Sequence, residues 1–267
     1  MQAKINPEQL ALLIETVQQS PKYAQIAPSL IERIASEELE KRTNFADCVK
    51  AVRSRLHQLT GAYLPAKVNY AQWSALFRDP AQNKQELCRR MLRLHASTAE
   101  RLPFLESFYT TCLASISPVN SVLDLACGLN PLALPWMPIE EDCIYLACDV
   151  LKPMIDFLNE FFKSIAIYGQ AFPCDLTSGL PSQSVQLAFL LKTLPLLDQI
   201  DKTLGRRLLE GIQAEHILVS YPAKSLGGRS KGMPANYSAA FYHTIEGLNF
   251  KVEAFTFPTE IAFLLSR

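Results

Sequence analysis

After Pro118 the chain alternates short apolar runs with segments of helical periodicity, and no other feature of the sequence constrains the fold as strongly. The apolar runs of strand length occupy residues 121–125, 143–148, 166–168, 185–191 and 216–221. Such alternation predicts a parallel sheet with helices on both of its faces. Two further runs, 250–257 and 261–265, are separated by a Pro-Thr-Glu turn, which predicts a terminal antiparallel hairpin.

The first hundred residues show helical spacing of apolar residues instead. Residues typical of helix starts mark four predicted helices, at Pro7, Pro28, Asn44 and Asp79. We therefore predict an all-helical domain over residues 1–101 and an α/β domain over residues 102–267.

The formal net charge is zero, but the charge is divided unevenly between these two parts. Residues 1–101 carry 15 Lys+Arg against 10 Asp+Glu, a balance of +5, and the remaining residues carry 11 against 16, a balance of −5. A basic helical module can supply the phosphate contacts that dominate nucleic-acid affinity. Arg53, Arg89 and Arg90 are our candidates for these contacts. An ordinary solvated helical surface accounts for the same charges equally well.

Bulk features indicate a cytoplasmic protein without a membrane segment. No apolar run approaches the ~20 residues that cross a bilayer, and the first ten residues contain no apolar signal core. The seven cysteines are spaced irregularly and form no zinc-like pattern with the histidines. We expect reduced, buried thiols, no metal, and a monomer.

The end of the first predicted strand carries an aspartate and a glycine-containing turn, in Asp124-Leu125-Ala126-Cys127-Gly128. Gly128 lets a ligand approach the backbone closely. Asp149 and Asp175 end the next two predicted strands, where such folds meet the ribose and the adenine of a nucleotide-like ligand. Taken singly, each aspartate fits a loop residue or a helix cap equally well. The full G-x-G-x-x-G motif is absent, which argues against a dinucleotide.

Three acids at successive strand ends fit S-adenosylmethionine, whose sulfonium and ammonium groups are cationic. A parallel sheet that ends in a hairpin is typical of the class I (Rossmann-like) S-adenosylmethionine-dependent methyltransferases, here with an N-terminal all-helical domain. Pro173-Cys174 resembles the nucleophile pair of 5-methylcytosine enzymes, but it lies at the third strand, whereas that nucleophile follows the fourth. We therefore interpret Cys174 as structural.

Four stretches of the chain resemble one family closely, the aminoglycoside-resistance 16S rRNA (guanine(1405)-N(7))-methyltransferases. They are LHASTAERL (94–102), VLDLACGLNPLAL (122–134), LLKTLPLLD (190–198) and VSYPAKSLGGRSKGM (219–233). The resemblance implies methylation of N7 of guanine 1405 in the 16S rRNA of the assembled 30S ribosomal subunit, with S-adenosylmethionine as cofactor. It also implies resistance to aminoglycosides of the kanamycin and gentamicin type.

The resemblance also implies roles for individual residues. Those on the cofactor side are His95, Ser97, Thr98, Arg101, Asp124, Ala126, Gly128, Asp149, Asp175, Leu176 and Leu191. Arg101 is a candidate partner of the cofactor's methionine carboxylate. The residues implied near the target base are Lys192, Arg229 and Lys231. Two alternatives stay open: Ser97 with Glu100 also forms a capping-box pattern, and His95 also fits a packed core histidine.

Two other functions remain possible on the sequence. One is a methyltransferase that acts on another RNA position or on a small molecule. The other is a non-catalytic ribosome-binding module that retains a vestigial cofactor fold.

Overall fold

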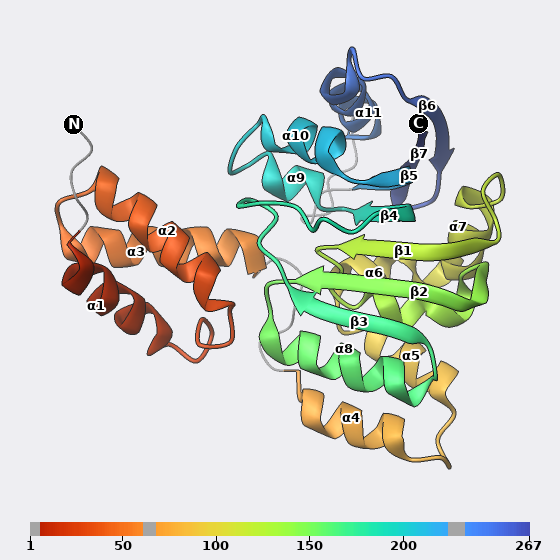
Figure 1. Ribbon diagram of the computed structural model, residues 1–267, viewed down its shortest axis with the longest axis horizontal. Coiled ribbons are helices and arrows are strands. Elements are labelled where there is room, and N and C mark those ends of the chain that lie inside the picture. Colours follow the sequence, from red (N-terminus) through yellow and green to blue (C-terminus); the bar gives the residue numbers. More distant parts are fainter. Residues whose placement is uncertain (1–5, 61–67, 224–232) are drawn as a thin grey trace.

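The computed structural model describes residues 6–60, 68–223 and 233–267. These residues form one seven-stranded sheet of order β3-β2-β1-β4-β5-β7-β6 (Figure 1). The strands are β1 Val119–Leu125, β2 Ile139–Asp149, β3 Tyr168–Pro173, β4 Val185–Leu191, β5 Ala214–Pro222, β6 Lys251–Thr256 and β7 Glu260–Ser266. The pairs among β1–β5 are parallel, and β7 lies antiparallel between β5 and β6. This arrangement confirms the predicted class I methyltransferase fold with its terminal hairpin.

The central strands are buried on both faces because alternate side chains enter two different cores. On β4, Leu187 and Phe189 pack on one side, and Ala188 and Leu190 pack on the other. The first side is covered by α4 Tyr70–Arg78, α5 Lys84–Leu92, α7 Leu105–Cys112 and α8 Lys152–Ser164. The second is covered by α9 Leu194–Leu197, α10 Leu204–Gly211 and α11 Met233–Ile245. Between α5 and α7 lie α6 Ala96–Arg101 and the 3-10 helix η1 Leu102–Phe104.

The segment that follows β1 is a 3-10 helix, η2, over Asn130–Trp136. Pro131 stands in its first turn, as the sequence indicated for a helix start. Pro135 lies inside it and supplies no N–H donor, which opposes a regular α-helix at this place. Six of its seven residues are buried, and Asn130 lines the pocket described in the next subsection.

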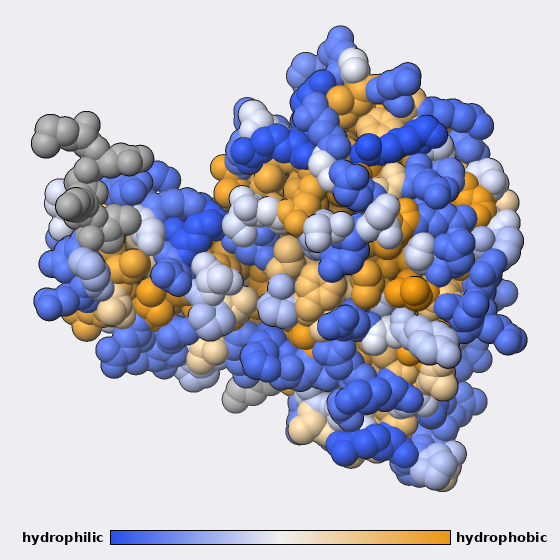
Figure 2. All heavy atoms as spheres, viewed as in Figure 1, coloured by the Kyte–Doolittle hydropathy of each residue, from blue (hydrophilic) through white to orange (hydrophobic). Residues whose placement is uncertain are grey.

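The N-terminal helices α1 Pro7–Gln18, α2 Pro28–Lys41 and α3 Phe45–Thr60 form a bundle with its own apolar core. In Figure 2 this bundle is the smaller lobe beside the body of the molecule. Two backbone hydrogen bonds attach it: Ala27 N donates to Val150 O at 2.9 Å, and Lys152 N donates to Gln25 O at 3.1 Å. Within the described ranges no helix is long and apolar enough to cross a membrane.

The packing differs from the predicted boundary at residue 101. Phe77 of α4 and Leu87 of α5 belong to the core that α8 and the sheet share, and not to the core of the bundle. No helix was predicted over the residues of α4, and no packing partner was predicted for α5. The helix predicted from Asp79 corresponds to α5 and begins later than predicted, because Asp79 Oδ1 accepts from Ala81 N at 2.9 Å in a turn and Asn83 caps α5.

Candidate functional site

A pocket lies at the carboxyl ends of β1, β2, β3 and β4, the edge where open α/β sheets meet their ligands. It is lined by every residue that the sequence predicted for the cofactor: His95, Ser97, Thr98, Arg101, Asp124, Ala126, Gly128, Asp149, Asp175, Leu176 and Leu191. Lys192, predicted beside the target base, lines it as well. The structure therefore brings together residues that are up to 97 positions apart in the sequence, counted from His95 to Lys192 (192 − 95).

Asp124 is a buried carboxyl group near the end of β1, with 1% of the residue exposed. Its Oδ2 accepts from Asn130 Nδ2 at 2.9 Å and from Tyr145 Oη at 2.8 Å. Burial raises the pKa of Asp124 to about 7, although these two hydrogen bonds act in the opposite direction. A group poised between its charged and neutral forms near neutral pH is typical of functional sites.

Asp149 ends β2 and ties the turn after β1 to the strand. Its Oδ2 accepts from Gly128 N at 3.0 Å, and its Oδ1 accepts from Val150 N at 2.7 Å. Burial raises the pKa of Asp149, and the N–H of Gly128 opposes this shift. Gly128 has φ +52°, and a Cβ there would lie 2.9 Å from Nε2 of His95. Glycine is therefore required both by the backbone conformation and by the closeness of the imidazole ring.

The α6 helix supplies His95, Ser97 and Thr98 to the pocket wall. His95 is the N-cap residue of α6 and its side chain accepts no capping hydrogen bond, so the alternative of a capping box formed by Ser97 and Glu100 is wrong. The reason lies in the start of the helix, which is two residues too early for Ser97 to cap it. Burial lowers the pKa of His95 to about 3, and Lys192 and Arg101 act in the same direction, so the ring is neutral. Thr98 Oγ1 donates to Leu92 O at 2.7 Å.

Arg101 and Lys192 form a buried ion cluster with Glu260, a residue whose role the sequence analysis did not identify. Arg101 Nε donates to Glu260 Oε2 at 3.0 Å, and Lys192 Nζ lies 3.4 Å from the same oxygen. Burial alone would raise the pKa of Glu260, but Arg101 and Lys192 hold it below its ordinary value. Glu260 starts β7, which is far from the pocket in sequence, so only the pairing of β7 with β5 reveals its position.

The amine of Lys192 is engaged on three sides. Nζ donates to Glu100 Oε2 at 2.7 Å and to the carbonyl of Ser97 at 3.1 Å, besides its contact with Glu260. Lys192 has φ +56°, and Ala126 at the end of β1 has φ +50°. Left-handed non-glycine residues are uncommon and gather at ligand sites. Their presence after two neighbouring strands supports this edge of the sheet as the functional one.

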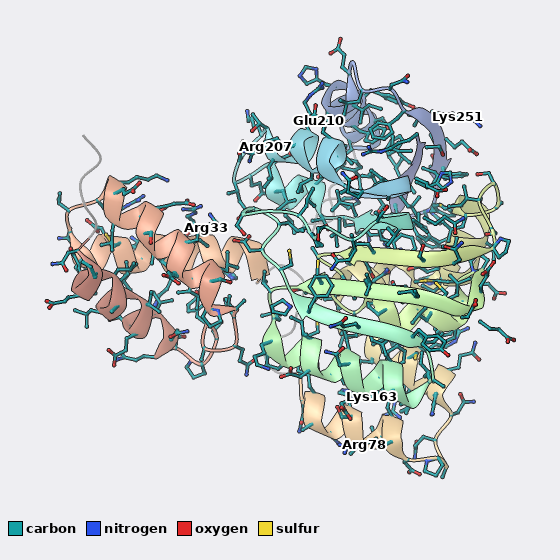
Figure 3. The ribbon with its side chains drawn as sticks, viewed as in Figure 1. Arg33, Arg78, Lys163, Arg207, Glu210 and Lys251 are labelled. Atoms are coloured by element: carbon teal, nitrogen blue, oxygen red, sulfur yellow. The ribbon has the colours of Figure 1, made fainter. Side chains whose placement is uncertain are left out.

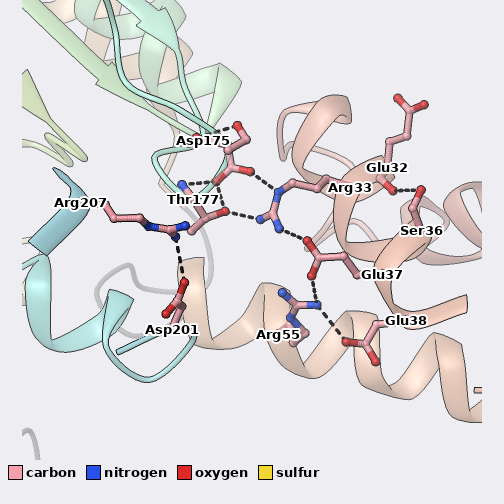
Figure 4. A network of polar contacts seen from close by, with 11 residues as sticks. Glu32, Arg33, Ser36, Glu37, Glu38, Arg55, Asp175, Thr177, Asp201 and Arg207 are labelled. Carbon is pink, nitrogen blue, oxygen red and sulfur yellow. Dashed lines mark hydrogen bonds and ion pairs between the residues drawn. The ribbon is translucent and has the colours of Figure 1, made fainter. Parts of the chain in front are cut away.

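Asp175 follows β3 and faces the N-terminal bundle as well as the pocket. Its Oδ2 accepts from Arg33 Nε at 2.8 Å, and its Oδ1 accepts from Thr177 Oγ1 at 2.6 Å (Figure 4). Arg33 belongs to α2 and lies where the bundle meets the α/β unit (Figure 3). Leu30, also on α2, lines the pocket itself. Sequence reasoning missed both residues, since no local pattern connects α2 with β3.

The basic residues that were predicted to contact RNA occupy several different places. Arg89 stacks over Trp136 at 4.7 Å, and Arg90 stacks over Trp73 at 5.5 Å. Arg53 donates to the carbonyl of Thr16 at 2.9 Å. These three side chains therefore have partners inside the protein. Arg229 and Lys231 lie outside the described residues, and their predicted role stays a prediction.

Comparisons with known proteins show the family to which the chain is similar. The family model described as ribosomal RNA methyltransferase (FmrO) matches residues 19–262 of the chain. A protein of Frankia casuarinae named 16S rRNA (guanine(1405)-N(7))-methyltransferase is 36% identical over 237 residues, which cover 85% of this chain and 83% of that protein. A Serratia marcescens protein of the same name is 33% identical over 249 residues, covering 93% of this chain and 94% of that protein.

Solved structures give the same picture for the fold. The structure of the 16S rRNA methylase RmtB has a TM-score of 0.82 and 27% identity, covering 98% of this chain and 100% of that one. The crystal structure of the 16S rRNA methyltransferase RmtF in complex with S-adenosyl-L-homocysteine has a TM-score of 0.83 and 27% identity, covering 98% of this chain and 99% of that one. Both similarities include the helical bundle, because they extend over nearly the whole chain.

Proposed function

The chain belongs to the FmrO family of ribosomal RNA methyltransferases, and from this premise we propose that it methylates N7 of guanine 1405 in 16S rRNA with S-adenosylmethionine. One observation supports the proposal above all. Asp124, Asp149 and Asp175, each at or near the end of a different parallel strand, line one pocket with Gly128. This arrangement favours a protein that binds S-adenosylmethionine over a ribosome-binding module whose cofactor fold is vestigial.

The residues of the pocket fit S-adenosylmethionine. Asp149 would hold the ribose hydroxyls, Asp124 the ammonium group and Asp175 the adenine amino group. Gly128 keeps the turn after β1 free of a side chain, and Leu176 and Leu191 give apolar walls. His95 is neutral, so it adds no positive charge against a cationic ligand.

The chemistry needs little from the protein beyond positioning. When bound, S-adenosylmethionine supplies a methyl group on a positively charged sulfur. N7 of guanine carries a free lone pair, so no proton has to be removed before it attacks, and in-line alignment supplies the rate. Lys192 lines the pocket, and its amine is held by Glu100, Glu260 and the carbonyl of Ser97, so its contact with the target base stays a prediction.

The substrate in this proposal is the assembled 30S subunit, which the bundle engages through phosphates. Lys22 and Lys50 are exposed on the bundle, and neither pairs with a carboxylate among the described residues. Lys22 Nζ lies 2.8 Å from His57 Nδ1, and Lys50 stands seven residues before His57 on the same side of α3. We expect Arg229 and Lys231 to hold phosphates around the target guanine.

The proposal extends to the setting in which the protein works. We infer a monomer in the cytoplasm whose product blocks aminoglycosides of the kanamycin and gentamicin type. The inference of aminoglycoside resistance rests on the resemblance of the sequence to the resistance enzymes and on the family match.

The deciding experiment maps the modified nucleotide. Intact 30S subunits are incubated with the full chain and methyl-labelled S-adenosylmethionine, and 16S rRNA is analysed by mass mapping and by primer extension after cleavage at N7-methylguanine. We expect one label at guanine 1405 and none on naked 16S rRNA. A label at another nucleotide would establish a different RNA methyltransferase, and no label with cofactor bound would overturn the proposed substrate.

A further inference from the structure

The bundle reaches the cofactor pocket through one helix, α2. Leu30 is fully buried and lines the pocket beside Leu151 and Met154, which belong to the α/β unit. Arg33 follows one turn later, at the spacing that places two side chains on the same face of a helix. The side of α2 that faces the pocket therefore presents one apolar and one cationic side chain.

Arg33 fixes the loop that carries Asp175. Its Nε donates to Asp175 Oδ2 at 2.8 Å, and its Nη2 donates to Thr177 Oγ1 (Figure 4). The remaining terminal nitrogen, Nη1, donates to Glu37 on α2, which holds the guanidinium against its own helix. The side chain of Asp175 is 6% exposed and that of Arg33 is 23% exposed. Such a sheltered charged contact is stronger than an ion pair on an open surface.

Two backbone hydrogen bonds hold the start of α2 against the other side of the pocket. Ala27 N donates to Val150 O, and Lys152 N donates to Gln25 O, so the chain before α2 adds a short antiparallel bridge to the segment after Asp149. The bundle thus contacts both segments that carry the proposed ribose and adenine acids, Asp149 and Asp175. An attachment used only to tether a docking domain would not need to meet these two segments.

We propose that the helical bundle completes the cofactor site, with Leu30 as a wall and Arg33 as a positioning residue for Asp175. This inference rests on the proposed function. Thr177 donates to Oδ1 of Asp175 from both its backbone N and its Oγ1, and Arg33 donates to Oδ2, so the carboxylate has one orientation and Oδ2 retains a lone pair for a further donor. The donor that this orientation selects is the 6-amino group of adenine.

The test for Arg33 compares two ligands that differ at that amino group. The affinities of the full chain for S-adenosylhomocysteine and for its 6-oxo analogue S-inosylhomocysteine are measured by calorimetry, in the wild type and in Arg33→Met. We expect Arg33→Met to raise the dissociation constant of S-adenosylhomocysteine about tenfold and that of S-inosylhomocysteine less than about twofold. The reason is that only S-adenosylhomocysteine carries the 6-amino group that donates to Asp175. Arg53→Met is the matched control, since Arg53 donates to the carbonyl of Thr16 inside the bundle.

The outcomes separate the alternatives. Equal weakening of both ligands would make Arg33 a structural tie between the bundle and the sheet and would overturn the proposal. Equal binding of the two ligands by the wild type would overturn it as well, because Asp175 would then not recognise the adenine. A wild type that binds neither ligand would contradict the proposed function itself.

Leu30 is tested by a pair of neighbouring truncations. Leu30 and Ile31 are both fully buried on α2, but only Leu30 lines the pocket. We expect Leu30→Ala to raise the dissociation constants of both ligands about fivefold, because apolar contact is lost. Ile31→Ala should leave both dissociation constants unchanged. Denaturation curves check that the two variants remain folded and lose comparable stability. Equal effects of the two truncations on ligand affinity would remove Leu30 from the site.

Discussion

Arg101 and Glu260, which are 159 residues apart in the sequence, form a two-bond ion pair that is closed to solvent. Nε and Nη2 of Arg101 donate to the two carboxylate oxygens at 3.0 and 2.5 Å, and the side chains are 1% and 0% exposed. Nη1 of Arg101 donates to Asn130 and Tyr109. A cofactor carboxylate bound by Arg101 would therefore share the guanidinium with Glu260. The contact predicted between Arg101 and the methionine carboxylate of the cofactor stays a prediction.

Removing Glu260 should destabilise the protein strongly, because it leaves Arg101 and Lys192 buried without their shared anion. We expect Glu260→Ala to lower the free energy of unfolding by about 3–5 kcal/mol. Guanidinium denaturation of the full chain measures this change. Glu210→Ala is the control, since Glu210 pairs with Arg206 at 46% and 41% exposure and should contribute less than about 1 kcal/mol. Similar losses in the two variants would contradict the prediction.

Asp149 should be needed for cofactor binding. Its carboxylate lies in the pocket and positions the turn at Gly128. Loss of a charged hydrogen-bonding group costs about 1.5–3 kcal/mol, so we expect Asp149→Ala to weaken S-adenosylhomocysteine about 10- to 100-fold. Calorimetric titration measures the affinity, with Asp142→Ala at an exposed position of β2 as control. An unchanged dissociation constant for Asp149→Ala would remove this residue from the site.

Cofactor affinity should rise with pH through the titration of Asp124. Burial raises the pKa of Asp124 to about 7, so the carboxyl group is protonated below this value and ionised above it. Only the ionised form attracts the cofactor's ammonium group, and below about pH 7 binding must release the proton. We expect the dissociation constant of S-adenosylhomocysteine to fall up to about tenfold per pH unit between about pH 6 and 7, and to level off near pH 8.

Asp124→Asn separates this effect from other titrations. The substituted amide keeps the shape of the side chain but does not titrate, so the affinity of this variant should be weaker and nearly independent of pH over the same range. The number of protons released is measured by calorimetry in buffers of different ionisation enthalpy. The same pH dependence in Asp124→Asn would assign it to another group, of which the nearby Asp149 is the first to consider.

Charge reversal on the bundle should weaken docking to the 30S subunit without affecting the cofactor. We expect Lys22→Glu with Lys50→Glu to reduce subunit binding at moderate salt. The slope of the logarithm of the binding constant against the logarithm of the salt concentration should become shallower by roughly one unit per lost phosphate contact. Lys163→Glu with Lys251→Glu is the control, because both lysines are exposed and lie far from the bundle (Figure 3). Equal effects of the two double variants would show that the bundle does not carry the docking surface.

The segment 225–233 should act in the methyl-transfer step. We expect Arg229→Ala with Lys231→Ala to slow transfer to 30S subunits at least about tenfold and to change subunit binding less, because the contacts offset the few kcal/mol needed to extrude a stacked base. Ser230→Ala controls for substitution in the same segment. Transfer rates, subunit binding and kanamycin resistance are compared. A wild-type rate with full resistance in the double variant would exclude these two residues.

Strand positions could be predicted where both faces of a strand are buried. Residues 185–191 were predicted as a strand and form β4, whose continuous apolar run reflects its central place in the sheet. The third strand was predicted at 166–168 but lies at Tyr168–Pro173. Ala166 has φ +55° and belongs to the preceding turn. As the edge strand, β3 is only partly buried, so its sequence carries a weak apolar signal.

The acids of the pocket could also be predicted, because the carboxyl ends of parallel strands must meet at one edge of the sheet. Glu260, Leu30 and Arg33 could not. Each reaches the site through contact between segments that are distant in sequence, such as the 142 residues that separate Arg33 from Asp175. A helical stripe of apolar residues indicates that a helix is covered, but not by which element. The placement of α5 against the sheet escaped prediction for the same reason, and α4 was not predicted as a helix.

The contact of the bundle with the pocket, through Leu30 in its wall and Arg33 on Asp175, bears on how selective an inhibitor of this protein can be. A cofactor mimic that contacts only the strand ends meets groups that the class I fold itself supplies, so it gains little discrimination among enzymes of that fold. A compound extended past the adenine toward α2 would approach the apolar side chain of Leu30 and the guanidinium of Arg33, which belong to α2 and not to the sheet. Selectivity would then come from the bundle, the part of the molecule that we also assign to the ribosome.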